Sequence, residues 1–264
     1  MTITMSTGVP ILVYHSVDDS GCLISVSPHF FRRQMYYLHE NGYRTVSLPE
    51  ALKYVKTSER KRLQDEKLIV ITFDDGYQTV YTQALPVLEQ CSFNATVFLA
   101  AGLCGREIRW KYRRDVSPKY RMLTWDEVKL MGNRGIDFGA HTLTHRRLTD
   151  LSLDAAREEI WQSKLLIEHM LGRSVDTFAF PFGMTNDSLK SIVRGAFRAA
   201  CTASPGFLRA ESDPYQLPRL SLGGYVVRLV PSHLFLRRFP HLYVGWKRLV
   251  AMIKEPKVKY AIED

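Results

Sequence analysis

The sequence predicts an α/β protein built on a parallel sheet or barrel, and three observations support this class. Segments typical of buried strands alternate with segments typical of amphipathic helices along most of the chain. Some strands are continuous apolar runs, of which IVITF over 69–73 is the clearest, as expected when helices cover both faces of a sheet. The 264 residues and 45% hydrophobic content are sufficient for one large core.

The N-terminal half alternates regularly between strand and helix. Ser27 is placed to cap the first helix, Pro28 suits its first turn, and Gly42 marks its end. Pro86 interrupts the second helix. The basic segment over 105–121 has no periodic pattern, so we expect an exposed excursion there. In order, the predicted elements are a strand over 9–14, a helix over 28–42, a strand over 69–73, a helix over 80–90 and a strand over 95–100.

The C-terminal half continues the same alternation. Thr124 and Glu127 form a capping-box pattern that opens a helix, and Gly172 ends the most regular helix of the chain. We expect one catalytic domain over 1–222 and a basic, aromatic tail over 223–264. The predicted elements are a helix over 124–135, a strand over 136–141, a helix over 154–171, a strand and turn over 178–183, a helix over 186–194 and a strand over 197–202.

The positive charge of the chain is concentrated at its end. Lys and Arg number 36 against 27 Asp and Glu, and the stretch from Arg219 onward supplies six of the nine net positive charges. The tail interleaves basic and aromatic side chains, which suits the surface of an anionic membrane; the alternative is a terminal helix packed on the domain. No DNA- or RNA-binding motif accompanies the charge, so we expect no nucleic-acid partner.

The cysteines and the N-terminal sequence bear on the cellular compartment of the protein. Cys22, Cys91, Cys104 and Cys201 lie far apart without C-x-x-C spacing, which favours free thiols in a reducing environment. The sequence shows neither the pattern of a signal peptide nor an apolar run long enough to span a membrane. We therefore expect a cytoplasmic protein, either free or peripheral at the inner membrane face. The sequence does not indicate its oligomeric state.

Two adjacent carboxylates, Asp74 and Asp75, directly follow the 69–73 strand. The carboxyl ends of parallel strands carry the functional loops of α/β proteins. Neighbouring carboxylates repel each other unless a cation or a shared proton separates their titrations. The alternative interpretation is an ordinary turn, because Asp and Gly are common turn formers. This stretch taken alone leaves both interpretations open.

His141 and His145 stand four residues apart after another predicted strand. In a continuing strand the two rings would be roughly 13 Å apart, whereas one helical turn would bring them onto one face. Joint action therefore requires the strand to end at His141. A polar helix face is the alternative, since the pattern lacks the Glu of H-E-x-x-H.

The two motifs support each other, because the carboxyl ends of parallel strands meet at one rim. Asp75, His141 and His145 then form an O/N ligand set suited to a divalent cation with open positions. In this interpretation Asp74, kept ionised by the cation, acts as a base towards the attacking water.

Five motifs together resemble the polysaccharide deacetylase family, also called carbohydrate esterase family four. They follow the family's order and span about 9–220, and the pair TFDDG and HTLTH is specific. The motifs are LVYHSV over 12–17, TFDDG over 72–76, HTLTH over 141–145, FAFPFG over 178–183 and LPRL over 217–220.

The resemblance implies a distorted (β/α) barrel that removes acetyl groups from N-acetylated sugars with a bound divalent metal, most often zinc. It makes Asp74 the general base of the reaction. It makes Asp75, His141 and His145 the metal ligands.

The same resemblance assigns two further roles. The backbone N–H of Phe182, after Pro181, would donate to the oxyanion. The early YH motif resembles that of poly-N-acetylglucosamine deacetylases and makes His15 the general acid, and no late Leu-x-x-His motif competes with it. The arginine that often precedes the proline of the third motif is missing, so we expect Arg219 to orient a carboxylate instead.

The resemblance does not extend to the substrate subsites, because the Asp-x-x-Asp-Trp motif is not visible. Tyr77, Trp125 and Leu143 are candidates for lining an acetyl or sugar pocket, although such side chains are more often core.

The predicted function is a metal-dependent hydrolase that removes N-acetyl groups from an N-acetylated amino sugar or polysaccharide and releases acetate. One alternative is a deacetylase of a lipid-linked or small amino-sugar metabolite, which would suit a cytoplasmic location. Another is a non-catalytic carbohydrate-binding protein on the same barrel. The presence of a base, metal ligands and an acid argues against this last alternative.

Overall fold

The structure, a computed structural model, describes residues 8–57, 66–110 and 119–222. The C-terminal tail over 223–264 and the middle of the basic segment 105–121 lie outside the described residues. The domain boundary at residue 222 therefore stays a prediction.

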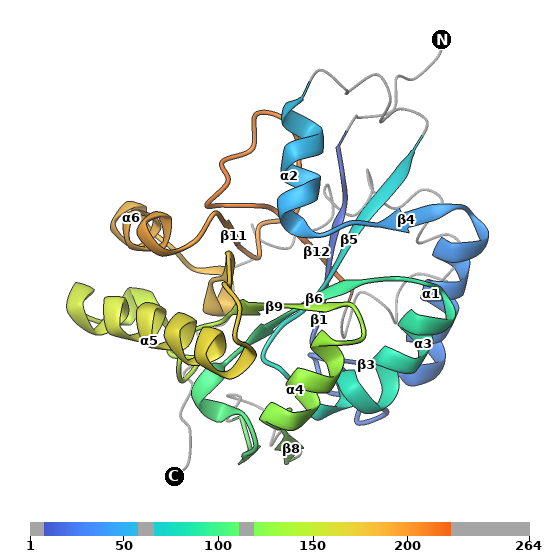
Figure 1. Cartoon of the computed structure of the whole chain (residues 1–264), viewed down its shortest axis with the longest axis horizontal. Coiled ribbons are helices and arrows are strands. Elements are labelled where there is room, and N and C mark those ends of the chain that lie inside the picture. Colours follow the sequence, from blue (N-terminus) through green and yellow to red (C-terminus); the bar gives the residue numbers. More distant parts are fainter. Residues whose placement is uncertain (1–7, 58–65, 111–118, 223–264) are drawn as a thin grey trace.

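A curled sheet of parallel strands forms the centre of the molecule (Figure 1). Its strand order is β11-β10-β9-β6-β5-β1-β12, and β4 also pairs with β5. A parallel bridge joins Cys201 in β11 to Leu217, three residues before β12, so the two edges of the sheet approach each other. The predicted (β/α) barrel is thereby confirmed. The strands are β1 (Ile11–Tyr14), β4 (Tyr43–Thr45), β5 (Lys67–Phe73), β6 (Ala95–Leu99), β9 (Ile136–Ala140), β10 (Thr177–Ala179), β11 (Ala199–Cys201) and β12 (Leu220–Ser221).

Strand β5 is the central element, since it pairs with β1, β4 and β6. Every residue after Lys67 in this strand is buried, which explains its continuous apolar sequence. The two carboxylates that follow it consequently emerge in the middle of the carboxyl-end rim of the barrel.

The helices begin and end at signals that the sequence displays. Ser27 caps α1 by accepting a hydrogen bond from the Phe30 N–H, and Thr124 and Glu127 form a complete capping box on α4. Gly172, with φ of 64°, ends α5 in the left-handed conformation. The described α-helices are α1 (Pro28–Glu40), α2 (Leu48–Lys56), α3 (Leu85–Gln90), α4 (Trp125–Gly132), α5 (Leu153–Leu171) and α6 (Asp187–Ala196).

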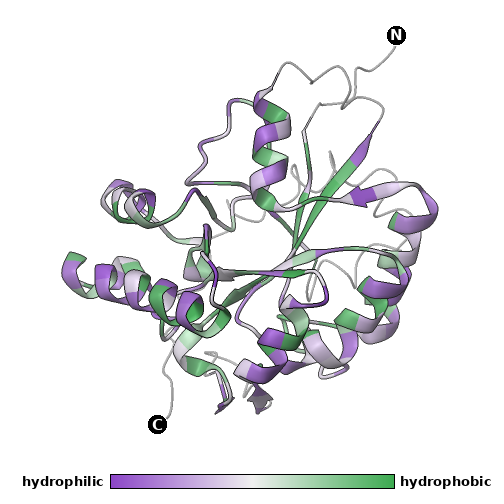
Figure 2. Ribbon diagram, viewed as in Figure 1, coloured by the Kyte–Doolittle hydropathy of each residue, from purple (hydrophilic) through white to green (hydrophobic). Residues whose placement is uncertain are grey.

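The helices lie around the outside of the sheet, with α1 and α3 on the right, α4 at the lower centre and α5 and α6 on the left of Figure 1. Their apolar faces meet the largely apolar strands, as the colouring in Figure 2 shows. Phe31 of α1 contacts Tyr14 of β1 edge to face, with 5.2 Å between ring centroids, and is fully buried. Burying one such side chain contributes about 1.5–3 kcal/mol, so these contacts fix the helices on the barrel.

Two regions differ from the expectations drawn from the sequence. Helix α2 and strand β4 were not predicted, although Ser47 and Glu50 form a capping box at the start of α2. The segment over 105–121 is not wholly an exposed excursion. Strand β7 (Glu107–Ile108) pairs antiparallel with β8 (Tyr120–Arg121), and Ile108, Trp110 and Tyr120 are buried. Two further short strands, β2 (Ser16–Val17) and β3 (Ser25–Val26), pair in parallel.

None of the helices in the described part of the chain is both long and apolar enough to cross a bilayer.

Candidate active site

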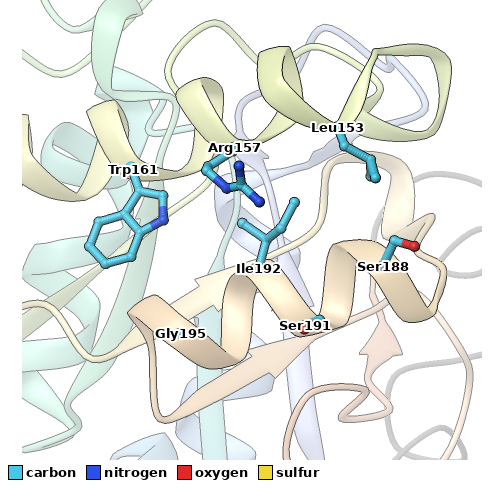
Figure 3. Close-up of a pocket in the computed structure, with 7 residues that line it drawn as sticks. All are labelled: Leu153, Arg157, Trp161, Ser188, Ser191, Ile192 and Gly195. Atoms are coloured by element: carbon cyan, nitrogen blue, oxygen red, sulfur yellow. The ribbon is translucent and has the colours of Figure 1, made fainter.

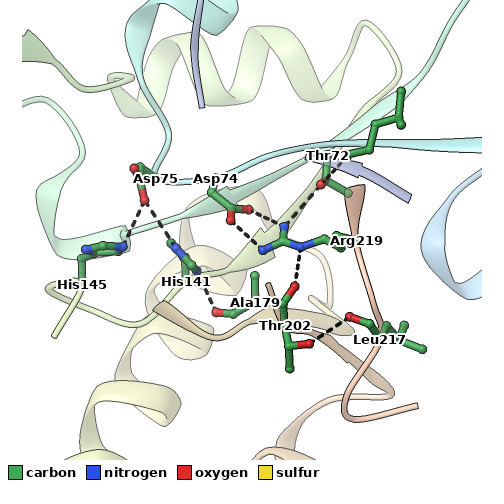
Figure 4. A network of polar contacts seen from close by, with 10 residues as sticks. Thr72, Asp74, Asp75, His141, His145, Ala179, Thr202, Leu217 and Arg219 are labelled. Carbon is green, nitrogen blue, oxygen red and sulfur yellow. Dashed lines mark hydrogen bonds and ion pairs between the residues drawn. The ribbon is translucent and has the colours of Figure 1, made fainter. Parts of the chain in front are cut away.

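Asp74 and Asp75 leave the end of β5 in different directions (Figure 4). The Asp74 N–H donates to the Tyr14 carbonyl at 2.9 Å, which continues the pairing of β5 with β1. Asp75 takes a left-handed conformation with φ of 71°, and Gly76 follows with φ of 87°. A Cβ at Gly76 would lie 2.8 Å from the Leu99 side chain. The turn and the functional pair are therefore not alternatives, because the turn separates the two carboxylates.

Asp75, His141 and His145 form a buried cluster at the carboxyl ends of β5 and β9. Oδ1 of Asp75 lies 3.4 Å from Nε2 of His141 and 3.1 Å from Nε2 of His145. Ligand atoms from all three residues lie within 4.8 Å of one another. The structure thus brings together the three residues that the sequence indicated as metal ligands.

The hydrogen bond of His141 indicates which of its ring nitrogens can bind a cation. Nδ1 of His141 lies 2.7 Å from the Ala179 carbonyl oxygen, which can only accept a hydrogen bond. Nδ1 of the neutral ring therefore carries the proton, and Nε2 presents a lone pair to Asp75. Oδ1 of Asp75 is buried and has no hydrogen-bond partner among the described residues. One carboxylate oxygen and two imidazole nitrogens that converge in this way fit a divalent cation such as Zn²⁺.

The electrostatics of the cluster also favour a cation. Burial alone would raise the pKa of Asp75, but the charge of His145 and the contacts with both imidazoles hold that pKa well below its usual value. Burial lowers the pKa of His141, yet the carboxylates of Asp74 and Asp75 outweigh burial and raise it. The imidazoles thus keep Asp75 ionised, and the carboxylates favour positive charge at this buried site.

The two histidines meet through a strained turn. Strand β9 ends at Ala140, so the strand stops where joint action of the histidines requires it to stop. Thr142 and His145 then have φ of 65° and 60°, and the Thr142 hydroxyl accepts the His145 N–H at 2.9 Å. The ring centroids of His141 and His145 are 4.9 Å apart. A tight turn, and not the helical turn considered from the spacing, brings them together.

Asp74 forms a two-point ion pair with Arg219 (Figure 4). Both contacts measure 2.7 Å, and both side chains are almost completely buried. Nε of Arg219 donates to the Thr202 carbonyl, which fixes the guanidinium in place. Burial would raise the pKa of Asp74, but the charges of Arg219 and His141 and the Arg219 hydrogen bonds keep it below its usual value. The expectation that Arg219 orients a carboxylate is confirmed by this contact.

His15 follows β1 at the same rim and is partly exposed. Burial lowers the pKa of His15, and the nearby negative charges of Asp75 and Asp74 offset only part of that effect. The pKa of His15 consequently lies below its usual value. A protonated imidazole here is therefore a stronger acid than a histidine in water.

Phe182 lies beside the cluster in a turn that follows β10. Its φ is 61°, and its ring meets that of His145 edge to face, with 4.8 Å between centroids. Gly183 comes next, with φ of 66°, and a Cβ there would lie 2.2 Å from the Ala203 nitrogen. Only glycine fits this close approach, and the ring of Phe182 lies next to a candidate metal ligand.

Backbone strain is concentrated at this rim. Five non-glycine residues in the described ranges have positive φ, and all but Ser92 belong to the site. Each such conformation costs on the order of 1–3 kcal/mol and persists only where surrounding contacts enforce it. Clustering of strain is typical of functional sites. The four strained site residues are Asp75, Thr142, His145 and Phe182.

Trp110 was not predicted to be part of the site. It is 4% exposed, its ring centroid lies 4.8 Å from that of His145, and its indole N–H donates to the Tyr77 hydroxyl. The alternation of Ile108 and Trp110 with charged residues in the basic segment was the available signal.

The residues considered for the sugar pocket have different surroundings. Tyr77 is completely buried, and its contact with Trp110 places it behind the site and not on its surface. Trp125 is partly buried against the core, and Leu143 is partly buried in the turn between the two histidines.

A shallow groove of about 470 Å³ lies between α5 and α6 (Figure 3). None of the residues that line it was predicted from the sequence to act in catalysis or metal binding. They are Leu153, Arg157, Trp161, Ser188, Ser191, Ile192 and Gly195.

A parallel barrel with paired carboxylates and histidines at the carboxyl ends of its strands defines a barrel hydrolase. The chain belongs to the polysaccharide deacetylase family, whose family model matches residues 61–196. The fold and the family predicted from the sequence are thereby confirmed.

Individual relatives agree with this assignment. The Bacillus subtilis protein YxkH is 32% identical over 213 residues, which cover 80% of this chain and 70% of that protein. The poly-β-1,6-N-acetyl-D-glucosamine N-deacetylase of Staphylococcus epidermidis is 23% identical over 209 residues, 74% of this chain and 67% of the relative. The solved structure of the Streptococcus pyogenes deacetylase PplD in complex with acetate has a TM-score of 0.71 and 25% identity, over 83% of this chain and 93% of PplD.

Proposed function

We propose that this protein is a metal-dependent carbohydrate N-deacetylase. The observation that supports this function best is the division between two adjacent carboxylates. Asp75 faces two imidazole nitrogens, and Asp74 is held by Arg219. These different partners support a role for Asp75 in holding a cation and a role for Asp74 in moving a proton.

Asp75, His141 and His145 would hold the cation, and their donor set fits zinc. When bound, the cation polarises the acetyl carbonyl and makes water a better nucleophile. The Ala179 carbonyl fixes the His141 ring, and the Thr142 hydroxyl fixes the His145 backbone. The protein therefore holds the ligands in place before the metal arrives.

Asp74 takes the proton of the attacking water. Arg219 holds the carboxylate in one orientation and keeps it ionised. A carboxylate has about four lone-pair sites, so the two contacts with Arg219 leave capacity to accept a proton. General bases placed in this way contribute typically 10²–10⁴-fold to the rate.

Phe182 and His15 complete the reaction. The Phe182 N–H donates a hydrogen bond to the oxyanion formed when water attacks the carbonyl carbon. His15 then gives its proton to the nitrogen as the C–N bond breaks, which releases acetate and a free amine.

We propose an N-acetylglucosamine polymer as the substrate class, because a relative named for deacetylating poly-β-1,6-N-acetyl-D-glucosamine aligns along 74% of this chain. The test is acetate release by zinc-loaded protein from a panel of β-1,6-linked oligomers, other N-acetylhexosamine polymers, and lipid-linked or small amino sugars. Release from β-1,6-linked oligomers supports the proposal. Release from small or lipid-linked sugars alone would favour the metabolite alternative, and silence across the panel with metal bound would favour a carbohydrate-binding protein.

The cytoplasmic location and the role of the tail over 223–264 are further proposals. The membrane-surface hypothesis predicts that the full chain floats with anionic liposomes and that a chain ending at residue 223 does not. Equal behaviour of the two chains would contradict it.

A further inference from the structure

Glu159 is a buried carboxylate of α5 that the proposed mechanism does not use. It is 9% exposed, and no cationic side chain of the described ranges pairs with it. Its partners lie in the turn between the two candidate histidine ligands. Oε2 accepts the Thr144 N–H at 2.9 Å, and Oε1 accepts the Thr144 hydroxyl proton at 2.6 Å. The backbone carbonyl of Glu159 accepts the Leu143 N–H at 3.1 Å.

The turn that Glu159 holds does not form by local preference. Thr142 and His145 both take left-handed conformations, which are uncommon for residues other than glycine and are especially unfavourable for a β-branched threonine. Other elements hold its first half, since the Ala101 N–H donates to the Thr142 carbonyl and the Gly102 N–H donates to the Leu143 carbonyl. On the other side, Glu159 holds Thr144, the residue directly before His145.

We propose that Glu159 is a positioning residue of the metal centre, whose carboxylate holds Thr144 so that Nε2 of His145 stays opposite Oδ1 of Asp75. This inference rests on the proposed metal site. Outer partners that orient metal ligands typically account for 10–100-fold in metal affinity. Glu159 does not contact the His145 ring itself and acts through Thr144, the residue directly before this ligand.

Two substitutions of Glu159 distinguish the loss of its hydrogen bonds to Thr144 from the loss of its charge alone. Glu159→Leu removes both acceptors. Glu159→Gln keeps an acceptor for the Thr144 N–H, and its amide can donate to the Thr144 hydroxyl, which both donates and accepts. Glu158→Leu is the matched control, because Glu158 is the neighbouring residue on the same helix and is exposed. Thr144→Val removes the hydroxyl from the same contact and serves if Glu159→Leu does not fold.

The measurements are the Kd for Zn²⁺, by competition with a chromogenic chelator, and the visible absorption spectrum of the Co²⁺-loaded full chain. Circular dichroism verifies that each variant is folded. For Glu159→Leu we expect a Kd about 10–100-fold weaker and an altered Co²⁺ spectrum. Thr144→Val should change both readouts in the same direction. Glu159→Gln and Glu158→Leu should resemble the wild type.

A folded Glu159→Leu or Thr144→Val variant with the wild-type Kd and Co²⁺ spectrum would overturn the inference and leave the metal site standing. A Glu158→Leu variant as weak as Glu159→Leu would also overturn it. Absence of Zn²⁺ binding by the wild type would instead overturn the proposed function, and this inference with it.

Discussion

At the scale of single residues, the site depends on sending two neighbouring carboxylates to different partners. The left-handed backbone of Asp75 directs its carboxylate to the imidazoles, while Asp74 remains in line with β5 and meets Arg219. In an extended strand such neighbours would also face opposite ways, but one would point into the packed core. The turn keeps both at the rim.

Replacing Arg219 should alter both stability and pH dependence. Arg219→Met leaves Asp74 as an uncompensated buried charge, so we expect a loss of about 3–5 kcal/mol in the free energy of unfolding at neutral pH. Without the guanidinium, burial dominates and the pKa of Asp74 rises. The acidic limb of kcat/KM should then move to higher pH.

The sign of the pH effect on stability follows from the same shift. The folded-state pKa of Asp74 lies below its unfolded value, so the ion pair stabilises the protein above the unfolded pKa. That contribution is lost as pH falls through the folded pKa, so the difference between wild type and Arg219→Met should shrink in acid. Arg44→Met is the control, because the Arg44–Glu66 pair is exposed and should change stability by less than about 1 kcal/mol. Equal effects of the two substitutions would contradict this account.

The sequence patterns predicted which residues form the site but not the backbone conformation of those residues. The position of Asp75, His141 and His145 after strand ends indicated that they would meet, and the rim of the barrel brings them together. No sequence pattern predicted the left-handed conformations of Thr142 and Phe182, because tertiary contacts impose them against local preference. Glu159 was missed for a related reason, since a helical glutamate usually faces solvent.

At the scale of elements, agreement with the sequence follows the strength of local signals. Helix α5 carries an apolar stripe, a serine cap and a terminal glycine, and it was predicted almost to its ends. Helix α2 is only nine residues long, and its capping box was overlooked. The buried part of the 105–121 segment was also missed, because its apolar residues are few and their burial depends on contacts with Tyr77.

Replacing glycine by alanine should have opposite effects on stability at Gly183, which lies next to Ala203, and at Gly195, which lies in α6. Gly183→Ala places a Cβ against the Ala203 backbone at a positive φ, so we expect a loss of more than about 1 kcal/mol. Gly195→Ala meets nothing within 4 Å inside a helix, so we expect a gain of about 0.5–1 kcal/mol. Urea unfolding measures both, and changes of the same sign would contradict the geometry described here.

At the scale of the whole molecule, the barrel brings together residues that are far apart in sequence. Asp74 and Arg219 are separated by 145 positions, yet β5 and β12 both flank β1 and place them in contact. The order of strands and helices was enough to predict that Asp75 and His141 would meet, because parallel strands share one carboxyl-end rim. The contact of Arg219 with a carboxylate was expected only from the resemblance of its motif. Which side chains pair across the rim depends on strand register, which the sequence pattern did not specify.

Metal removal should destabilise the whole domain. A ligand present at 100 times its Kd adds about 2.7 kcal/mol to stability, so chelation should lower the Tm by about 5–10 °C. Added Zn²⁺ should restore it. Asp75→Asn provides the control, since its Tm should respond to neither treatment, and a wild-type Tm indifferent to chelation would contradict a structural effect of the metal.

The central claim is that Asp75 holds the metal and Asp74 moves the proton. The most direct measurement is the rate of acetate release by Asp74→Asn, taken together with its zinc content, on an N-acetylglucosamine oligomer that the wild type deacetylates. The account predicts one zinc per chain, as in the wild type, and a rate lower by about 10²–10⁴-fold. A wild-type rate in this variant, or a loss of zinc equal to that in Asp75→Asn, would contradict the division of roles between the two carboxylates.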